Sequence, residues 1–272
     1  MFTKKNRKMI DNSIKNKIVL ITGAAGGLGR EFALTFAKMG AKVAIADMNR
    51  EGAVETAKII GKNALPLTVN VSNEESVKKM VEQVVKKWGR IDILINNAAI
   101  YAGLERKPFY EIEEAEWDKV MNVNIKGVWQ VSKAVAKVMI HQFKNDVSTS
   151  SPSGGGGGCK IINISSATVM SGSPNWSHYV TSKAGVIGLT RTMAKELGDF
   201  NITVNAIAPG FTLTEASLNL MENAQKYGVD RGAIKRPSSA QDIVGTAVYL
   251  ASSASDFVTG QTIIVDGGKQ FL

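Results

Sequence analysis

The chain has 272 residues, of which 44% are hydrophobic and 21% are charged, and its formal net charge is +9. It has no run of 18 or more apolar residues, which excludes an ordinary transmembrane helix, and its single cysteine excludes an internal disulfide. Because six basic residues and one acidic residue place +5 of this charge within residues 1–17, we expect neither a nucleic-acid nor a membrane partner.

Residues 1–16 are predicted to form a basic, flexible tail, since they carry much of the excess charge and lack an apolar pattern. Residues 17–272 alternate short apolar runs with segments of helical periodicity, which predicts a single α/β domain. The lone cysteine and the basic N-terminal segment without an apolar run lead us to expect a cytoplasmic protein.

The predicted strands and helices alternate along the chain. Strands are expected at 17–22, 41–46, 64–70, 91–95, 160–165, 202–207 and 261–265. Helices are expected at 30–39, 50–61, 73–88, 114–143, 177–197 and 239–252. This alternation predicts a Rossmann-type, doubly wound parallel sheet of about seven strands flanked by helices.

Two segments interrupt the alternation. Residues 145–158 contain five consecutive glycines and several serines, which predicts a surface loop before the fifth strand rather than a domain boundary. Residues 209–238 are too long and too mixed in composition for a simple connection. We expect this second segment to form a lid over a substrate.

A glycine-rich turn follows the first predicted strand. Gly23, Gly27, Leu28 and Gly29 lie within the run Thr-Gly-Ala-Ala-Gly-Gly-Leu-Gly, directly before a predicted helix. Glycines let the backbone approach a pyrophosphate, and the N-terminus of the helix offers free N–H groups and a favourable dipole. The motif between strand and helix therefore predicts a dinucleotide-binding loop, with a glycine turn that binds no ligand as the alternative.

Asp47 ends the second predicted strand, at a spacing from the glycine turn that is typical of a carboxylate holding the adenosine ribose 2′-hydroxyl. A carboxylate there repels a 2′-phosphate, and the glycine at position 26 offers that phosphate no basic side chain. Both observations favour NAD over NADP. Arg50 is the nearby residue that would favour NADP.

Ser166 follows the fifth predicted strand, and Tyr179 and Lys183 are four residues apart in the next predicted helix. Residues at positions i and i+4 share one face of a helix. An ammonium group near a phenol favours the phenolate and lowers the phenol's pKa, so such a tyrosine can exchange a proton with a substrate oxygen. The pair alone is weak evidence, because a solvated helix face can carry the same spacing.

Together these motifs resemble the short-chain dehydrogenase/reductase family over nearly all of residues 16–270. The resemblance implies one dinucleotide-binding and catalytic domain that uses a nicotinamide cofactor. One departure is Ala99, which replaces the last glycine of the family's Asn-Asn-Ala-Gly motif and narrows the space beside the cofactor. The residues that the resemblance implies for the cofactor are Gly23, Gly27, Leu28, Gly29, Asp47, Asn70, Val71, Asn97, Ala98, Tyr179, Lys183, Pro209, Gly210, Thr212 and Thr214.

The resemblance also implies roles for four catalytic residues. Tyr179 would be the general acid/base, and Lys183 would lower its pKa and hold the hydroxyls of the nicotinamide ribose. Ser166 would hydrogen-bond the substrate oxygen and stabilise developing charge. Asn124 would hold a water molecule that links Lys183 to solvent.

The candidate substrate pocket has apolar and aromatic side chains with little charge. These residues follow predicted strand ends or flank the tyrosine, where open α/β sheets bind ligands. The pattern favours a hydrophobic secondary alcohol or ketone over a sugar or a phosphorylated compound, although several of the residues could simply belong to the core. The candidates are Tyr101, Thr168, Met170, Trp176 and Phe211.

Three functions remain open from the sequence. The first is an NAD-dependent secondary-alcohol dehydrogenase, and the second is a 3-oxoacyl-(acyl-carrier-protein) reductase, which would favour NADPH. The third is a dinucleotide-binding sensor or scaffold without catalysis, which the presence of both Tyr179 and Lys183 disfavours. We expect no metal site, because no His/Cys cluster has ligand spacing, and the resemblance implies a homodimer or homotetramer.

Overall fold

The computed structural model describes residues 13–145, 158–218 and 223–271, and their central element is a parallel seven-stranded sheet. The strand order is β3-β2-β1-β4-β5-β6-β9. Each predicted strand is present, with ends shifted by one or two residues. The strands are β1 (Ile18–Thr22), β2 (Lys42–Asp47), β3 (Ala64–Thr68), β4 (Ile93–Asn96), β5 (Cys159–Ile164), β6 (Ile202–Pro209) and β9 (Thr262–Val265).

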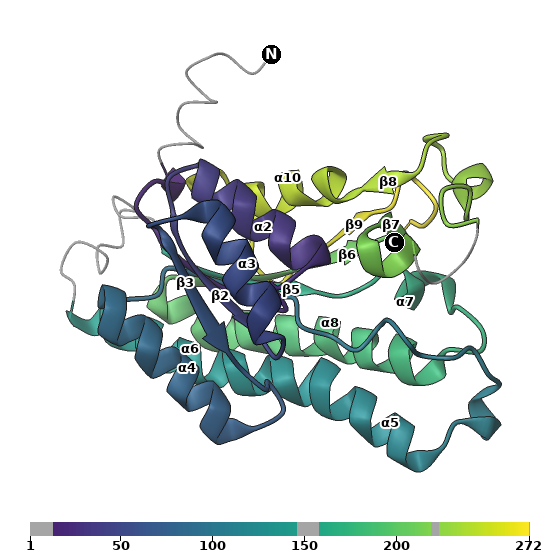
Figure 1. Ribbon diagram of the computed structural model, residues 1–272, viewed down its shortest axis with the longest axis horizontal. Helices are drawn as coiled ribbons and strands as arrows, with labels where there is room; N and C mark the ends of the chain where they lie inside the picture. The colour runs from purple at the N-terminus through teal and green to yellow at the C-terminus, as the bar shows by residue number, and fades with distance from the viewer. Residues whose placement is uncertain (1–12, 146–157, 219–222, 272) are drawn as a thin grey trace.

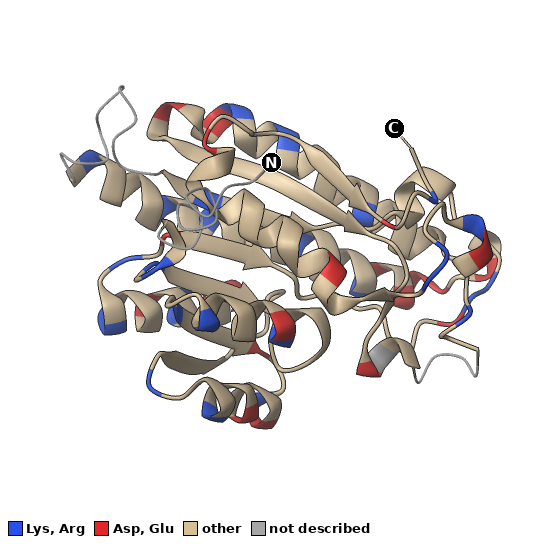
Figure 2. Cartoon of the chain, turned by 90° about the horizontal axis from the view of Figure 1, so that it is seen from above, with Lys and Arg blue, Asp and Glu red and all other residues tan. Residues whose placement is uncertain are grey.

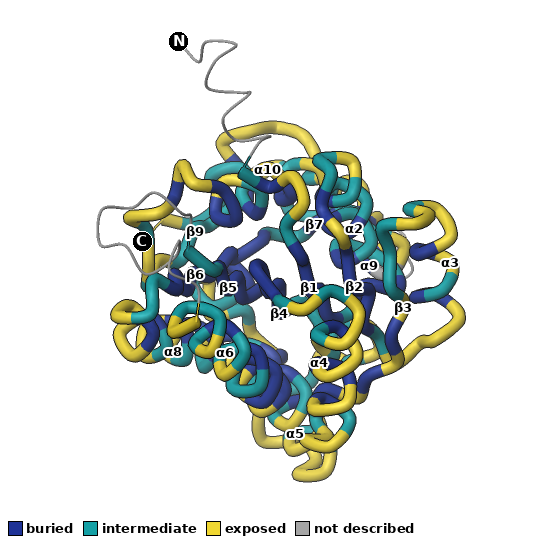
Figure 3. Tube along the Cα trace, turned by 90° about the vertical axis from the view of Figure 1, so that its left-hand side faces the viewer, coloured by how far each residue is buried: buried dark blue, intermediate teal, exposed yellow. Residues whose placement is uncertain are grey.

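Helices cover both faces of this sheet, as Figures 1 and 3 show. One face packs against α2, α3 and α10, and the other against α4, α6 and α8. Alternate residues of β1 enter the two cores: Val19 and Ile21 face the first, and Ile18 and Leu20 the second. The long helices are α2 (Gly27–Lys38), α3 (Arg50–Ile60), α4 (Glu74–Trp88), α6 (Gly127–Asn145), α8 (Ser177–Leu197) and α10 (Ala240–Ala251).

The helix predicted over 114–143 is interrupted. Helix α5 (Glu114–Met121) leads into a π-helical turn at Asn122–Lys126, and α6 begins after it. A π turn inserts one residue into the helical repeat, which a search for apolar periodicity does not detect. The inserted turn carries Asn124, whose side chain is fully buried.

The strand order reverses between β1 and β4, so the loops after these two strands separate at the carboxyl edge of the sheet. In open α/β sheets this switch point is where ligands bind. The glycine turn follows β1, and Asn97 follows β4. The fold therefore brings these two predicted cofactor segments to the same edge.

The segment 209–238 contains short elements that the sequence did not predict. Strands β7 (Thr212–Leu213) and β8 (Ser238–Ser239) pair in parallel, and a short helix α9 (Glu215–Leu218) follows β7. Another short helix, α7 (Thr168–Ser171), follows β5. Parts of three predicted features lie outside the described residues: 1–12 of the tail, 146–157 of the glycine-rich loop and 219–222 of the lid.

Charged residues lie mainly on the outer sides of helices and in loops, with basic and acidic side chains interspersed, while the strands carry few of them (Figure 2). Among the described helices, none has the length and apolar character needed to cross a bilayer.

Candidate active site

A cavity of about 1340 Å³ lies along the carboxyl edge of the sheet. Nearly every residue predicted for the cofactor, the catalytic group or the substrate lines it. The three exceptions are Gly29, Asn124 and Met170. Most of the predicted residues therefore lie in one cavity wall, and the first two exceptions act on that wall indirectly.

The glycine turn is packed too tightly for larger residues. A Cβ on Gly23, which has φ +66°, would lie 2.7 Å from the Cα of Ala98. A Cβ on Gly29 would collide with the carbonyl oxygen of Gly23. The Asn97 side-chain amide donates to the carbonyl oxygens of Thr22 and Gly23, at 3.1 and 2.9 Å. Both glycines are thus required by the backbone, and Asn97 fixes the shape of the turn.

The N-terminus of α2 fits an anionic group. Its first residue follows Gly26, and no side chain caps the exposed N–H groups of the first turn. Gly26, Gly27 and Leu28 line the cavity at this point. Free N–H groups at a helix N-terminus beside glycine backbone suit a pyrophosphate, so this end of the cavity fits a dinucleotide.

Asp47 is the last residue of β2 and lines the same end of the cavity. Its Oδ2 accepts a hydrogen bond from the Ala25 N–H, and its Oδ1 accepts one from the Asn49 N–H, both at 2.9 Å. The carboxylate is thereby fixed beside the glycine turn. Each oxygen retains acceptor capacity for a hydroxyl donor.

Neither arginine near Asp47 faces the cavity. The Arg30 guanidinium donates to the carbonyl oxygen of Ala25 and pairs with Glu55 at 3.2 Å. Arg50 is exposed and is not among the residues that line the cavity. The side chains that do line it beside Asp47 include the uncharged Met48.

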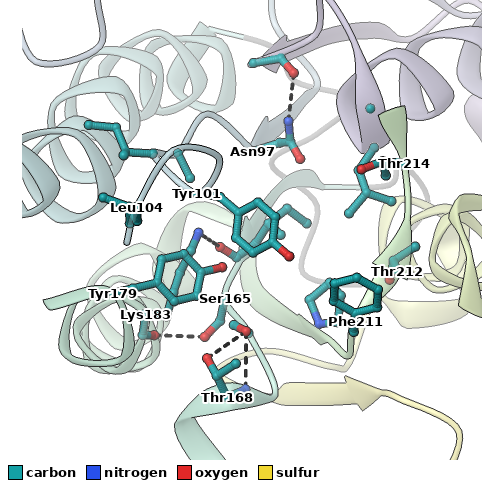
Figure 4. A pocket seen from close by; sticks show the side chains of 18 of the residues that line it. Asn97, Tyr101, Leu104, Ser165, Thr168, Tyr179, Lys183, Phe211, Thr212 and Thr214 are labelled. Carbon is teal, nitrogen blue, oxygen red and sulfur yellow. Dashed lines mark hydrogen bonds between the residues drawn. The ribbon is translucent and has the colours of Figure 1, made fainter. Parts of the chain in front are cut away.

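Tyr179 lies in an aromatic cluster at the opposite end of the cavity. Its ring stacks on Trp176 with centroids 4.3 Å apart, and the Tyr101 ring lies 5.7 Å away. Figure 4 shows Tyr179 and Tyr101 side by side, with Phe211 beyond Tyr101. Burial raises the pKa of Tyr179, while a hydrogen bond with Ser166 opposes this change. The net direction is opposite to the lowered pKa predicted from the sequence, because desolvation disfavours the phenolate.

Lys183 lies one helical turn after Tyr179, and its ammonium is 5.8 Å from the centre of the tyrosine ring. The ammonium donates to the carbonyl oxygen of Ile164 at 2.8 Å. Burial lowers the pKa of Lys183 to about 8. The Ser165 hydroxyl donates to the Lys183 carbonyl oxygen at 2.8 Å, which ties helix α8 to the end of β5.

Ser166 is buried and lies directly after β5. Its Oγ accepts hydrogen bonds from the Thr168 N–H and hydroxyl, at 3.2 and 2.9 Å. These contacts fix the Ser166 hydroxyl beside Tyr179, where a substrate oxygen could contact both side chains. Thr168, predicted as a substrate residue, thus also positions a predicted catalytic one.

Asn124 connects three parts of the site without lining the cavity. Its Oδ1 accepts from the Ile100 N–H at 2.8 Å, and its Nδ2 donates to the Ile100 carbonyl oxygen at 3.2 Å. The same Nδ2 donates to the Ser182 hydroxyl at 3.1 Å. The side chain therefore fixes the loop that leads to Tyr101 against helix α8. The water molecule that the resemblance implies for Asn124 stays a prediction.

A set of charged residues in the cavity wall was not predicted from the sequence. The prediction also included Met170, which lies in α7 and does not line the cavity. Lys269 comes just after the end of β9, so its position at a strand end could have identified it. No comparable signal pointed to Arg231, which lies far from any predicted strand end. The charged residues missed are Glu105, Arg106, Lys119, Glu215, Arg231, Asp266 and Lys269.

Comparisons with known proteins extend over almost the whole chain. Residues 23–270 match the family model described as Enoyl-(Acyl carrier protein) reductase. The chain is 39% identical over 259 residues to a 3-oxoacyl-(acyl-carrier-protein) reductase of Thermotoga maritima, covering 94% of this chain and 98% of that protein. It is 38% identical over 259 residues to the 2-dehydro-3-deoxy-D-gluconate 5-dehydrogenase of Escherichia coli, covering 94% and 96%.

Among solved structures, a 3-ketoacyl-(acyl-carrier-protein) reductase from Brucella melitensis, complexed with NADH, matches with a TM-score of 0.85. That match has 30% sequence identity and covers 95% of this chain and all of the other. Levodione reductase matches with a TM-score of 0.82 and 31% identity, covering 94% and 98%.

Proposed function

The chain belongs to the short-chain dehydrogenase/reductase family of oxidoreductases, and on that premise we propose that it transfers a hydride between NAD(H) and a secondary alcohol or ketone. The proposal rests on the grouping of Tyr179, Ser166 and Lys183 in one wall of the cavity. When bound, the nicotinamide supplies or accepts the hydride. The side chains of this chain then have to move one proton and orient the substrate.

Tyr179 is the proton donor to the substrate oxygen during reduction and the proton acceptor during oxidation. The hydroxyl of Ser166, fixed by Thr168, donates to the same oxygen and stabilises the charge that develops on it. The ammonium of Lys183 favours the phenolate that remains after the proton has moved. Asn124 holds the adjacent backbone in place through Ile100.

The preference for NAD rests on the wall beside Asp47. A 2′-phosphate at this position would meet a carboxylate, while Arg30 is engaged with Ala25 and Glu55. Ribose hydroxyls can instead donate to the carboxylate. The complex of the Brucella relative with NADH supports the same choice.

A second candidate is reduction of a 3-oxoacyl thioester with NADPH. The names of the Thermotoga and Brucella relatives favour the 3-oxoacyl thioester as substrate, although the Brucella structure holds NADH. Both candidates use the same proton-transfer group, so they differ in cofactor and in the body of the substrate rather than in mechanism.

The test is a panel of ketones, secondary alcohols and acetoacetyl thioesters, assayed with NADH and with NADPH by absorbance of the reduced cofactor. We expect ketone reduction with NADH, and a loss of about 10²- to 10⁴-fold in kcat for Tyr179→Phe. Tyr110→Phe, on an exposed tyrosine outside the cavity, is the matched control. A strong preference for NADPH and thioester would favour the second candidate, and no turnover of any compound by the parent would reject both.

We also propose that the chain works as a homodimer or homotetramer on a small-molecule substrate, without a nucleic-acid or membrane partner. Its exposed apolar side chains include Trp129 on α6 and Phe109 just before α5. Light scattering of the purified chain measures the assembly directly, and a monomeric mass would reject this part of the proposal.

A further inference from the structure

Arg231 and Lys269 come together at one side of the cavity although they are far apart in sequence. The Ile234 N–H donates to the carbonyl oxygen of Gly267 at 2.9 Å, which docks the segment around Arg231 on the turn after β9. A Cβ on Gly228 would lie 3.4 Å from Arg231 Nη2 and 3.4 Å from Lys269 Nζ. Because both nitrogens lie 3.4 Å from the same point, Arg231 Nη2 and Lys269 Nζ are at most twice 3.4 Å apart. Both residues line the cavity.

This pair of cations forms no salt bridge with the carboxylates of the described residues. Among the described residues, neither Arg231 nor Lys269 forms an ion pair, and the arginine instead lies 5.6 Å from the Tyr227 ring centre. The acid that acts on Lys269 is Asp266, whose Oδ1 accepts from the Gly268 and Lys269 N–H groups at 2.9 and 3.1 Å. These three groups together therefore carry one positive charge, with the Arg231 side chain exposed to solvent.

The energetics of Lys269 also indicate that a counter-charge is missing. Burial lowers its pKa, Asp266 raises it, and Arg231 lowers it further by repulsion. Placing a half-buried ammonium beside a guanidinium costs free energy unless an anion offsets the repulsion. A bound anion at this point would reverse that cost.

Aromatic rings connect the cations to the proposed proton-transfer group. Phe211 contacts Tyr227 with ring centroids 4.8 Å apart, and Arg231 lies over the same Tyr227 ring. Phe211 and Tyr101 both line the cavity, and Tyr101 contacts Tyr179. Aromatic rings therefore line the cavity from Tyr179 toward the pair of cations, with Phe211 beyond Tyr101 (Figure 4).

We infer that Arg231 and Lys269 form a carboxylate-binding subsite, so that the substrate is an oxo acid or hydroxy acid with an apolar middle. The inference rests on the proposed function and specifies its substrate class. The carbonyl lies beside Tyr179 and Ser166, and the carboxylate accepts hydrogen bonds from the two cations, which are the strong, charge-assisted kind. The reaction itself is the proposed hydride transfer and needs no further reagent.

The first experiment compares matched acids and esters. Levulinate and the longer 9-oxodecanoate, whose alkyl chain supplies the apolar middle, are assayed against their methyl esters with NADH, and acetoacetyl-pantetheine tests whether a neutral thioester is preferred. We expect kcat/KM for each acid to exceed that of its ester by about tenfold or more, mainly through KM. Equal turnover of acid and ester, or a preference for the thioester, would overturn the inference while leaving hydride transfer intact.

The second experiment removes the cations. Arg231→Met and Lys269→Met should each lower the acid-to-ester ratio of kcat/KM by about tenfold. Lys226→Met and Arg191→Met remove exposed charges that do not line the cavity and should leave the ratio unchanged. Lys269→Gln serves if the methionine variant does not fold. A ratio that falls equally in the control variants would overturn the inference.

A binding measurement keeps the inference testable if no turnover is found. Levulinate should raise the melting temperature of the parent chain more than methyl levulinate does, and the difference should vanish in Lys269→Met. Absence of turnover with a retained melting shift would reject the proposed function and leave the carboxylate subsite standing. Equal shifts by acid and ester would reject the subsite.

Discussion

At one end of the cavity, Gly23, Asp47 and Asn97 are fixed by hydrogen bonds between main-chain groups and short side chains. At the other end, Tyr101 and Phe211 present aromatic rings from separate segments. The first end leaves almost no choice of residue, because a Cβ added to its glycines would collide with backbone atoms. The second end can change its residues without changing the chain path, so it is where related enzymes can differ in substrate.

In this comparison, the largest expected effect comes from the glycine turn, which tolerates larger residues least. In Gly29→Ala, the new Cβ meets the Gly23 carbonyl oxygen, so the turn must shift although residue 29 does not line the cavity. Overpacking of this kind costs roughly 1–3 kcal/mol, and we expect NADH to bind about 10- to 100-fold more weakly. Fluorescence titration with NADH measures the dissociation constant.

Gly188→Ala is the matched control, since nothing lies within 4 Å of a Cβ at this helical position. It should leave NADH affinity unchanged and raise the free energy of unfolding by roughly 0.5–1 kcal/mol. Unchanged NADH affinity in Gly29→Ala would show that the turn is more adaptable than its contacts indicate, and the contrast between the two ends would fail.

The same contrast explains which parts of the protein could be predicted from sequence. Gly23, Asp47 and Asn97 lie just after strands, and backbone geometry restricts their residue types, so pattern and position identify them. All seven strands of the central sheet were predicted, because apolar runs determine them. Arg231 could not be predicted, because its approach to Lys269 depends on how a long irregular segment docks on the sheet edge.

Two other differences between the predictions from sequence and the structure also have physical causes. The interruption of the predicted 114–143 helix arises from one inserted residue, and the polar contacts of Asn124 that accompany it are tertiary. The pKa of Tyr179 is raised because the ring is buried beside Trp176 and Tyr101. A spacing of four residues along a helix cannot reveal this burial.

A smaller effect is expected from changing charge, rather than shape, at the cofactor end. Asp47→Asn keeps one of the two acceptor oxygens, loses the hydrogen bond to the other, and removes the charge that would repel a 2′-phosphate. We expect the ratio of kcat/KM for NADH over NADPH to fall about tenfold, while the acid-to-ester ratio of the substrate stays the same. Steady-state assays with both cofactors and both substrates measure the two ratios.

Glu51→Gln is the control for Asp47→Asn, because it removes an exposed charge close by, outside the cavity wall. It should change neither ratio. If Asp47→Asn altered the substrate ratio as strongly as the cofactor ratio, the two ends of the cavity would not act independently.

The smallest effect is the pH dependence of reduction, which we attribute to Lys183 beside Tyr179. The pKa of Lys183 is lowered by burial to about 8 from 10.5, while burial keeps Tyr179 protonated through this range. As pH rises through 8, the folded chain loses the ammonium that stabilises the phenolate. Carbonyl reduction at saturating substrate should therefore slow about threefold between about pH 7.5 and 8.5. A pH profile of kcat measures this.

Stability should move in the opposite direction over the same range. Above pH 8 the folded chain no longer carries a buried charge at Lys183, whereas the unfolded chain binds that proton up to about pH 10.5, so the free energy of unfolding rises with pH. Lys183→Met should abolish reduction yet exceed the parent in stability by up to about 3 kcal/mol at pH 7, and the gain should shrink above pH 8. Lys195→Met, on the exposed side of α8, should show neither change. A Lys183→Met variant that is less stable than the parent at pH 7 would mean that the hydrogen bond to Ile164 outweighs the cost of burying the charge.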